Sequence, residues 1–272
     1  MTTTRRVGNT VVGILLVLVF LAPVYWMINV SLQSSDALLR TPPAWFPFDP
    51  TWSGYAEALR TQGSHLVTSL VIALGTVVFT LLVSAPAAYA LARFRLRGTL
   101  ALVLVVLLVQ MVPGIVMANS LYPIFSGVGL LDSYPGMILA DSTLTVPFAV
   151  LILRTFMSGV PGELIEAARV DGCGQWRTFG SVVLPVCRNA VITAGLFSFL
   201  FAWADFLFAV SFTTGNTIQP ITVGIYRFVG NQTTNWNGVM ATAVLASIPA
   251  AVLLLTAQRY VAAGITGGGV KE

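Results

Sequence analysis

The chain has 272 residues, of which 56% are hydrophobic and only 9% are charged, and its mean hydropathy is +0.86. Soluble domains carry about a quarter charged residues, so this composition excludes an ordinary soluble protein and indicates one that spans a lipid bilayer. The net charge of +4 does not indicate a nucleic-acid-binding protein, because the arginines lie beside apolar runs and no basic cluster is interleaved with aromatic residues.

Six apolar stretches are each long enough to cross a bilayer as a helix, which takes about 20 residues. The first follows Arg5 and Arg6, as the apolar part of a signal peptide would, but it is too long for one and no small-residue cleavage site follows Val30. We therefore predict an all-α, polytopic membrane protein in which residues 1–272 form a single transmembrane domain. The six predicted transmembrane helices are residues 11–30, 66–91, 100–118, 137–157, 191–212 and 239–260.

Basic residues are distributed unequally between the two sides of these spans. Eleven of the 14 lie before the first span, in the second connection, around the fourth connection or after the last span. Only three, Arg40, Arg60 and Arg227, lie on the opposite side. Because cytoplasmic connections carry the excess of Lys and Arg, this distribution predicts that both termini are cytosolic.

An internal proline lies within the apolar run of the second, third, fourth and sixth predicted spans. Proline removes a backbone hydrogen bond and can kink its helix, and broken helices often line a transport pathway. Simple packing kinks explain any one of these prolines equally well. They are Pro86, Pro113, Pro147 and Pro249.

The connection between the fourth and fifth spans, residues 158–185, is far more polar than the spans it joins. Glu163 and Glu166 lie in the first turns of a predicted helix, where negative charge interacts favourably with the helix dipole. The dipeptide Asp171-Gly172 is a turn signal that ends this helix. A second short helix can follow the turn, so the connection is predicted to form a small helix–turn–helix at the cytosolic membrane surface.

The spacing of residues in this connection resembles the E-A-A loop of ABC importer permeases. The stretch reads E166-A-A, three residues, Gly172, nine residues, Val182, one residue and then L184-P185, with Val182 where Ile is commoner. We call residues 158–185 the E-A-A segment. The resemblance implies that its first helix is a coupling helix that docks onto a separate ATPase subunit. The residues it implicates in this coupling are Glu163, Glu166, Ala167, Ala168, Arg169, Asp171, Gly172 and Pro185.

Other stretches narrow the resemblance to the sugar-importing, MalG-like branch of these permeases. The proline- and tryptophan-containing residues 42–55, the stretch 129–136 and F201-A-W-A-D-F206 are similar to that branch, although Ala204 stands where Asn is usual. The C-terminal G264-I-T-G-G-G-V-K271 is similar to the tail of these proteins. The resemblance therefore implies a MalG-like ABC permease fold with six transmembrane helices and a cytosolic coupling helix.

The same resemblance implies a set of partners in a bacterial inner or plasma membrane. These are a second homologous permease subunit, two ATPase subunits, an extracytoplasmic solute-binding protein and a sugar-like substrate. It also implies that the tail reaches the ATPase subunits through Gly268, Gly269 and Lys271. The sequence leaves open whether the substrate is a sugar, an amino sugar or a glycerol phosphate ester.

Nothing in the sequence predicts ATP hydrolysis or metal binding by this chain. A phosphate-binding P-loop needs a lysine after its glycines and a helix to follow, and the only lysine here is Lys271, one residue from the end. One histidine and two separated cysteines do not make a metal site. We therefore predict a non-enzymatic subunit with no cofactor of its own, whose partner ATPase binds ATP and magnesium.

Two alternative functions remain open on the sequence alone. A transporter driven by protons or sodium needs ionisable residues within the membrane, and Asp141 and Asp205 are the acidic candidates. A membrane enzyme needs a nucleophile with its base, for which no cluster is evident. For an importer, aromatic, amide and carboxylate groups toward the outer side suit a polyol. The candidate pathway residues are Asn119, Tyr122, Trp203, Asp205 and Phe208.

Overall fold

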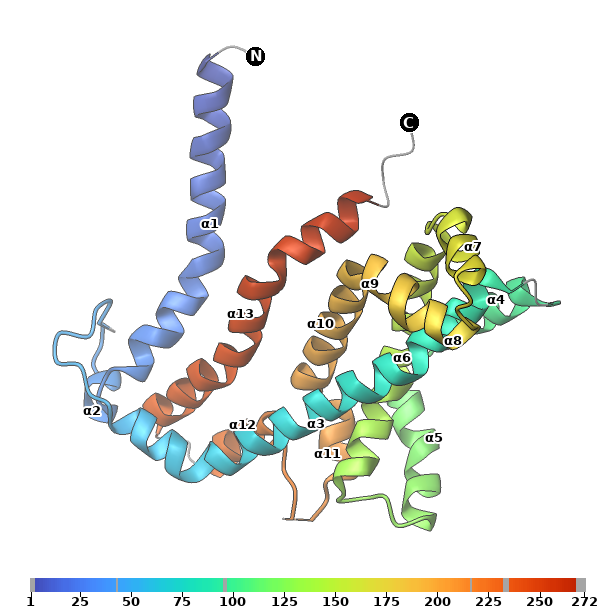
Figure 1. The fold of residues 1–272 in the computed structure, drawn as a ribbon. Coiled ribbons are helices and arrows are strands. Elements are labelled where there is room, and N and C mark those ends of the chain that lie inside the picture. The colour runs from blue at the N-terminus through green and yellow to red at the C-terminus, as the bar shows by residue number, and fades with distance from the viewer. Residues whose placement is uncertain (1–2, 43, 95–96, 216, 232–234, 268–272) are drawn as a thin grey trace. The chain divides into compact units, whose positions relative to one another are not determined.

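The computed structural model consists of helices and connections, and no strand occurs in the residues that it describes (Figure 1). This confirms the predicted all-α fold. The chain divides into two units, Met1–Leu66 with Gly224–Ile248 and Val67–Val223 with Pro249–Glu272. The structure describes residues 3–42, 44–94, 97–215, 217–231 and 235–267.

Four single helices in the described residues are long and apolar enough to cross a membrane, and two bent helix pairs raise the number of candidate spans to six. The first pair is bent by 96° and the second by 80°. The four helices are α1 (Thr3–Ser31), α3 (Ser53–Arg93), α6 (Tyr134–Ser158) and α13 (Trp236–Gly267). The bent pairs are α4 (Thr99–Gln110) with α5 (Gly114–Gly127), and Gln175–Val186 with α10 (Arg188–Ala204).

The third predicted span, 100–118, is not one continuous helix. Helix α4 ends at Gln110, and α5 begins after Pro113 and continues to Gly127. Pro113 has no N–H to donate to α4 and disfavours a helical conformation at the residue before it, so the helix stops there. Pro86, Pro147 and Pro249, in contrast, remain inside α3, α6 and α13.

The fifth predicted span, 191–212, is also interrupted. Helix α10 ends at Ala204, and the short α11 (Leu207–Phe212) follows. At the break, the carboxylate of Asp205 accepts the backbone N–H groups of Phe208 at 3.2 Å and Ala209 at 2.9 Å. A carboxylate in this position supplies the partners that the first N–H groups of a helix lack, so Asp205 stabilises the start of α11.

In the first unit, polar side chains tie the connection after α1 to that helix. The side-chain amides of Asn29 and Gln33 both donate to the carbonyl of Ala44, at 2.9 and 3.0 Å, and Ser31 shares a hydrogen bond of 2.8 Å with Tyr55. The short α2 (Ser35–Leu38) lies within this connection. The buried amides of Asn29 and Gln33 therefore hold the backbone at Ala44 against the end of α1.

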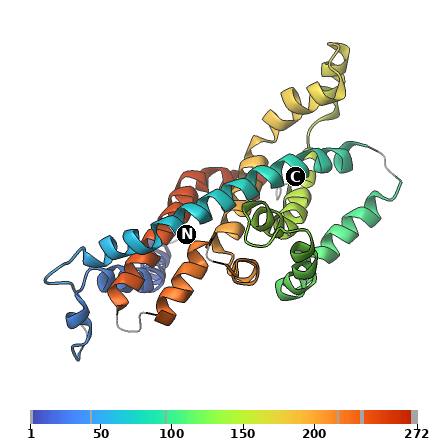
Figure 2. The ribbon, with the colours of Figure 1, turned by 90° about the horizontal axis from the view of Figure 1, so that it is seen from below.

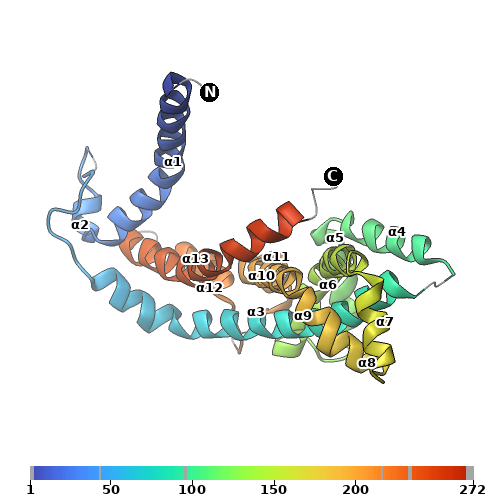
Figure 3. The same ribbon diagram turned by 45° about the horizontal axis from the view of Figure 1, so that its top comes forward.

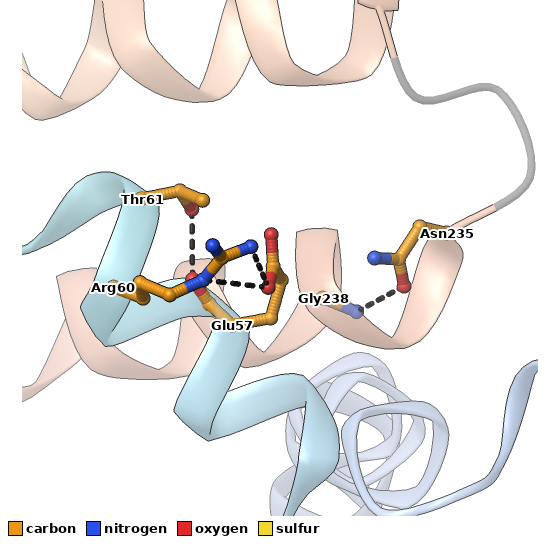
Figure 4. Close-up of polar contacts among 5 residues, drawn as sticks. All are labelled: Glu57, Arg60, Thr61, Asn235 and Gly238. Carbon is orange, nitrogen blue, oxygen red and sulfur yellow. Dashed lines mark hydrogen bonds and ion pairs between the residues drawn. The ribbon is translucent and has the colours of Figure 1, made fainter.

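Figure 4 shows two local contacts of the same unit. Arg60 and Glu57, one turn apart on α3, form an exposed ion pair at 2.8 Å. The side chain of Asn235 accepts the N–H of Gly238 at 3.3 Å and so caps the start of α13. The short α12 (Ile221–Asn231) precedes it.

The second unit contains two apolar cores. In one, α5, α6 and α11 pack together around Phe125, Met137, Phe208 and Phe212. In the other, α3, α6 and α10 pack with the E-A-A segment, and α6 lies alongside α10 (Figures 1 and 3). This second core positions the candidate functional site.

Candidate functional site: the E-A-A segment

The E-A-A segment forms a helix–turn–helix, as the sequence predicts. Helix α7 (Gly162–Val170) is followed by a turn and by a second helical stretch that begins with α8 (Gln175–Thr178). This stretch continues as a π-helix, η1 (Phe179–Val183), and ends with α9 (Leu184–Val186). In Figure 2 the segment, in yellow, projects from the rest of its unit. Short π-helical turns inside α-helices are frequent at functional sites.

A glycine in the left-handed conformation ends α7. Gly172 has φ of +80° and follows the last helical residues directly. Its N–H donates to the carbonyl of Arg169 at 3.0 Å, and the N–H of Cys173 donates to the carbonyl of Ala168 at 2.9 Å. These two bonds form a Schellman motif, which satisfies carbonyls that a helix end otherwise leaves unpaired. The predicted turn at Asp171-Gly172 is thus present, and its left-handed geometry favours glycine.

Helix α7 has one buried face and one exposed face. Ile165 and Ala168 are each 7% exposed, and Ile165 belongs to the second core of the unit. Ala168, one of the residues that the resemblance implicates in coupling, is therefore buried within its own chain. The remaining candidate coupling residues, which are all exposed, are Glu163, Glu166, Ala167, Arg169, Asp171, Gly172 and Pro185.

Three large apolar side chains of the segment are exposed, and the sequence interpretation missed them. Val170 at the end of α7 is 87% exposed, Trp176 in α8 is 77% exposed, and Leu164 is 44% exposed. The sequence does show these apolar residues between charged neighbours. However, an apolar residue in an amphipathic helix is usually assigned to the buried face, so their exposure was not predicted. Outside an apolar span, such exposure marks an interaction surface.

Aromatic contacts hold the second helical stretch against α3. The ring of Phe179 lies 5.1 Å from that of Tyr89 and 6.3 Å from that of Trp176. Trp176 and Pro86 both line two apolar cavities, of ≈ 460 and ≈ 220 Å³. The indole therefore lies over the part of α3 that contains its internal proline.

The five candidate pathway residues differ in their surroundings. Trp203 and Phe208 are buried, 7% and 0% exposed, and belong to the packing of the unit. Asn119 and Tyr122 are exposed on α5. Asp205 lines a cavity of ≈ 650 Å³.

The walls of that cavity are otherwise mainly apolar. They include Leu144, Phe197 and Phe201, and Phe201 is 49% exposed. Its ring also lies 5.7 Å from that of Phe148, edge to face. The sequence interpretation did not single out Phe201, which lines the same cavity as Asp205.

Two further parts of the site prediction concern the tail and metal binding. Gly268, Gly269 and Lys271 of the tail lie outside the described residues. Within the described part of the chain, no three His, Cys, Asp or Glu side chains form a group that could hold a metal ion.

Comparisons with known proteins identify the family. The model of the family described as binding-protein-dependent transport system inner membrane component matches residues 81–267, which include the whole E-A-A segment. A second model, described as spirocyclase AveC-like, matches residues 8–140, which is less than half of the chain.

Two curated relatives and one solved structure match nearly the full length. The sulfoquinovosyl glycerol transport system permease protein SmoH of Agrobacterium fabrum is 34% identical, over 92% of this chain and 89% of its own. The diacetylchitobiose uptake system permease protein DasC of Streptomyces coelicolor is 31% identical, over 98% and 97%. The crystal structure of a bacterial ABC transporter involved in alginate import has the same fold, with a TM-score of 0.81 at 20% identity over 96% and 98% of the two chains.

The extent of the family match, the full-length relatives and the helical fold agree with one another. The chain therefore belongs to the family of inner-membrane components of binding-protein-dependent transport systems.

Proposed function

We propose that this chain is the permease subunit of an ATP-driven ABC importer for a sugar or sugar-like solute, in the MalG-like branch, and that its E-A-A segment binds the ATPase subunit. The observation that carries the proposal is the exposed apolar surface of this segment. Val170 and Trp176 expose large apolar side chains on either side of the Schellman turn at Gly172. Both relatives named above are permeases of systems whose named solutes are carbohydrates.

The proposed mechanism is alternating access driven from outside this chain. ATP and magnesium are bound by two ATPase subunits, and closure of these subunits displaces the E-A-A segment. Because the segment is continuous with α6 and α10, its displacement tilts both helices and opens the pathway outward. Hydrolysis then returns the inward-facing state.

The remaining partners complete the pathway and deliver the solute. A second homologous permease subunit forms the other half of the pore, an extracytoplasmic binding protein supplies the sugar, and the tail at Gly268, Gly269 and Lys271 contacts the ATPase subunits. The cavity at Asp205 suits a sugar, because Phe201 offers an aromatic face and the carboxylate accepts hydroxyl groups. Two of the candidate pathway residues, Trp203 and Phe208, are buried within this chain.

The proposed topology places both termini and the E-A-A segment in the cytosol. A thiol introduced at the exposed Asp49, in a background without Cys173 and Cys187, should react with a membrane-impermeant maleimide added outside intact cells. A thiol at Val170 should react only after the membrane is permeabilised. Labelling of Val170→Cys in intact cells would contradict the topology.

The ATPase-binding role is tested at the exposed apolar surface. We expect Val170→Asp to lower the affinity for the ATPase subunit by roughly tenfold or more, because burying an unpaired carboxylate in an apolar contact costs several kcal/mol. The measurement is co-purification of the ATPase together with sugar uptake in vesicles. The matched control is Val186→Asp, at an exposed valine beyond the family's E-A-A pattern. Equal ATPase binding by wild type and Val170→Asp would count against the proposal.

A further inference from the structure

One arginine links the end of α3 to the start of the E-A-A segment. Arg93 lies in the last turn of α3, and its Nη2 donates to the backbone carbonyl of Val160. Val160 is 5% exposed and directly precedes Pro161, which caps the start of α7. The contact therefore joins two elements that are 67 residues apart in the chain, at the point where the segment begins.

The position of this contact has an electrostatic reason. Helix α6 ends at Ser158, with Gly159 as its cap, so the carbonyl of Val160 lies next to the negative end of the α6 dipole. A cation donating hydrogen bonds at a helix C-terminus satisfies free carbonyls and complements this dipole. The Nε of Arg93 is buried and has no hydrogen-bond partner among the described residues. The guanidinium is thus directed into the protein rather than toward solvent.

A second contact of α3 reaches the other half of the segment. Tyr89, one turn before Arg93, is 7% exposed, and its ring lies 5.1 Å from that of Phe179 in the π-helix η1. The last turns of α3 therefore contact the E-A-A segment both before α7 and after the turn at Gly172. Figures 1 and 3 show this end of α3 beside α7 and α8.

We propose that Arg93 is a positioning residue that makes α3 move together with the E-A-A segment. The helices α6 and α10 follow the segment because they are covalently continuous with it, whereas α3 contacts it, in the described residues, through the side chains of Arg93 and Tyr89. The Arg93–Val160 hydrogen bond supplies the directional link, and the Tyr89–Phe179 contact keeps the two surfaces in register. This inference rests on the proposed function, since it concerns how movement of the segment reaches a third helix.

The first test measures the number of sugars imported per ATP hydrolysed. It uses the importer reconstituted together with its ATPase subunits and binding protein, and compares substitutions of Arg93. Arg93→Met keeps the apolar stem but removes every donor, and it should lower the number of sugars imported per ATP hydrolysed by roughly tenfold, the worth of one charge-assisted hydrogen bond. Arg93→Lys keeps a charged donor and should recover much of the ratio. Arg97→Met removes an exposed arginine of the same connection and should leave the ratio unchanged.

The second test measures the link itself. Spin labels at the exposed Leu82 of α3 and Ser181 of η1, in a background without Cys173 and Cys187, report the distance between helix and segment by pulsed electron resonance. We expect the same distance with and without ATP when Arg93 is present, and a distance that changes with ATP in Arg93→Met. If Arg93→Met does not yield folded protein, Arg93→Gln, with a neutral donor, should show a smaller change of the same kind.

The outcomes separate this inference from the proposed function. If wild type binds and couples to the ATPase but Arg93→Met retains the full import ratio and an unchanging distance, the role of Arg93 is overturned while the proposed function stands. A distance that already changes with ATP in wild type also overturns it. If wild type does not bind an ATPase subunit at all, both proposals are overturned.

Discussion

Gly172→Val should reduce sugar uptake at least tenfold while the protein still inserts at the normal level. Gly172 has φ of +80°, and a β-branched residue in this left-handed region is a steric outlier. The strain costs about 1–2 kcal/mol, which corresponds to a shift of roughly tenfold in the population of the native turn. Both hydrogen bonds of the Schellman motif depend on this turn, so the surface formed by Val170 and Trp176 should lose its arrangement. The measurement is uptake in vesicles alongside co-purification of the ATPase.

The substitution separates backbone strain from steric exclusion. A Cβ at Gly172 has no atom of this chain within 4 Å, so nothing inside the chain clashes with it. Gly172→Asn adds a larger side chain but tolerates the left-handed conformation, and it should retain most of the uptake. Gly174→Val, two residues away at φ of −67° and also in open space, is the matched control. Full uptake by Gly172→Val would refute a role for this turn in coupling, and loss in Gly172→Asn would assign the effect to bulk at the docking surface.

Gly136→Ala should markedly destabilise the second unit, although it adds only one methyl group. A Cβ at Gly136 would lie 1.9 Å from the carbonyl oxygen of Leu130, which already accepts the hydroxyl of Ser133 at 2.6 Å. A backbone oxygen cannot rotate away, so α6 or the preceding loop must shift, at a cost of about 1–3 kcal/mol for overpacking. Displacing Ser133, whose hydroxyl accepts the N–H of Gly136 at 3.1 Å, also weakens the cap of α6 by about 1 kcal/mol.

The loop before α6 carries this effect further. Asp132 has φ of +52°, its N–H donates to the carbonyl of Phe212 at 2.9 Å, and its carboxylate accepts the N–H of Gly215 at 2.7 Å. A shift at Leu130 therefore also disturbs the connection that follows α11. Thermal unfolding in detergent should show a midpoint several degrees lower for Gly136→Ala. Gly127→Ala, where a Cβ meets no atom within 4 Å, should unfold at or above the wild-type temperature. Equal midpoints for the two variants would contradict the predicted clash.

Signals within short stretches of the sequence were sufficient to predict that the chain is a membrane protein, that it is helical, and where the E-A-A segment lies. Apolar runs of about 20 residues reflect the cost of exposing polar backbone to lipid, which is set by local composition. The helix–turn–helix was equally readable, because a glycine after Asp171 acts through its own backbone freedom. The spacing from Glu166 to Pro185 sufficed to indicate the family, which the full-length comparisons confirm.

Helix breaks inside apolar stretches could not be located in this way. Of the prolines in the predicted spans, Pro113 coincides with a break between two helices, whereas Pro86, Pro147 and Pro249 remain inside theirs. The local effect of proline is the same at each position, and the neighbouring helices decide whether the freed carbonyl finds another partner. At Asp205 no proline signals an interruption, yet the helix ends there. The carboxylate of Asp205 then caps the start of the next helix.

The sequence by itself determined that the chain spans a membrane, that it is helical, and where its patterned polar connection lies, because these depend on composition and spacing within about 20 residues. Only the tertiary structure decided which side chains of that connection face outward. Ala168 is buried while Val170 is exposed, although both fit an amphipathic helix, because the second core covers one side of α7. The contact of Arg93 with Val160 likewise joins residues that are distant in the chain, and such a pairing depends on how α3, α6 and α7 pack.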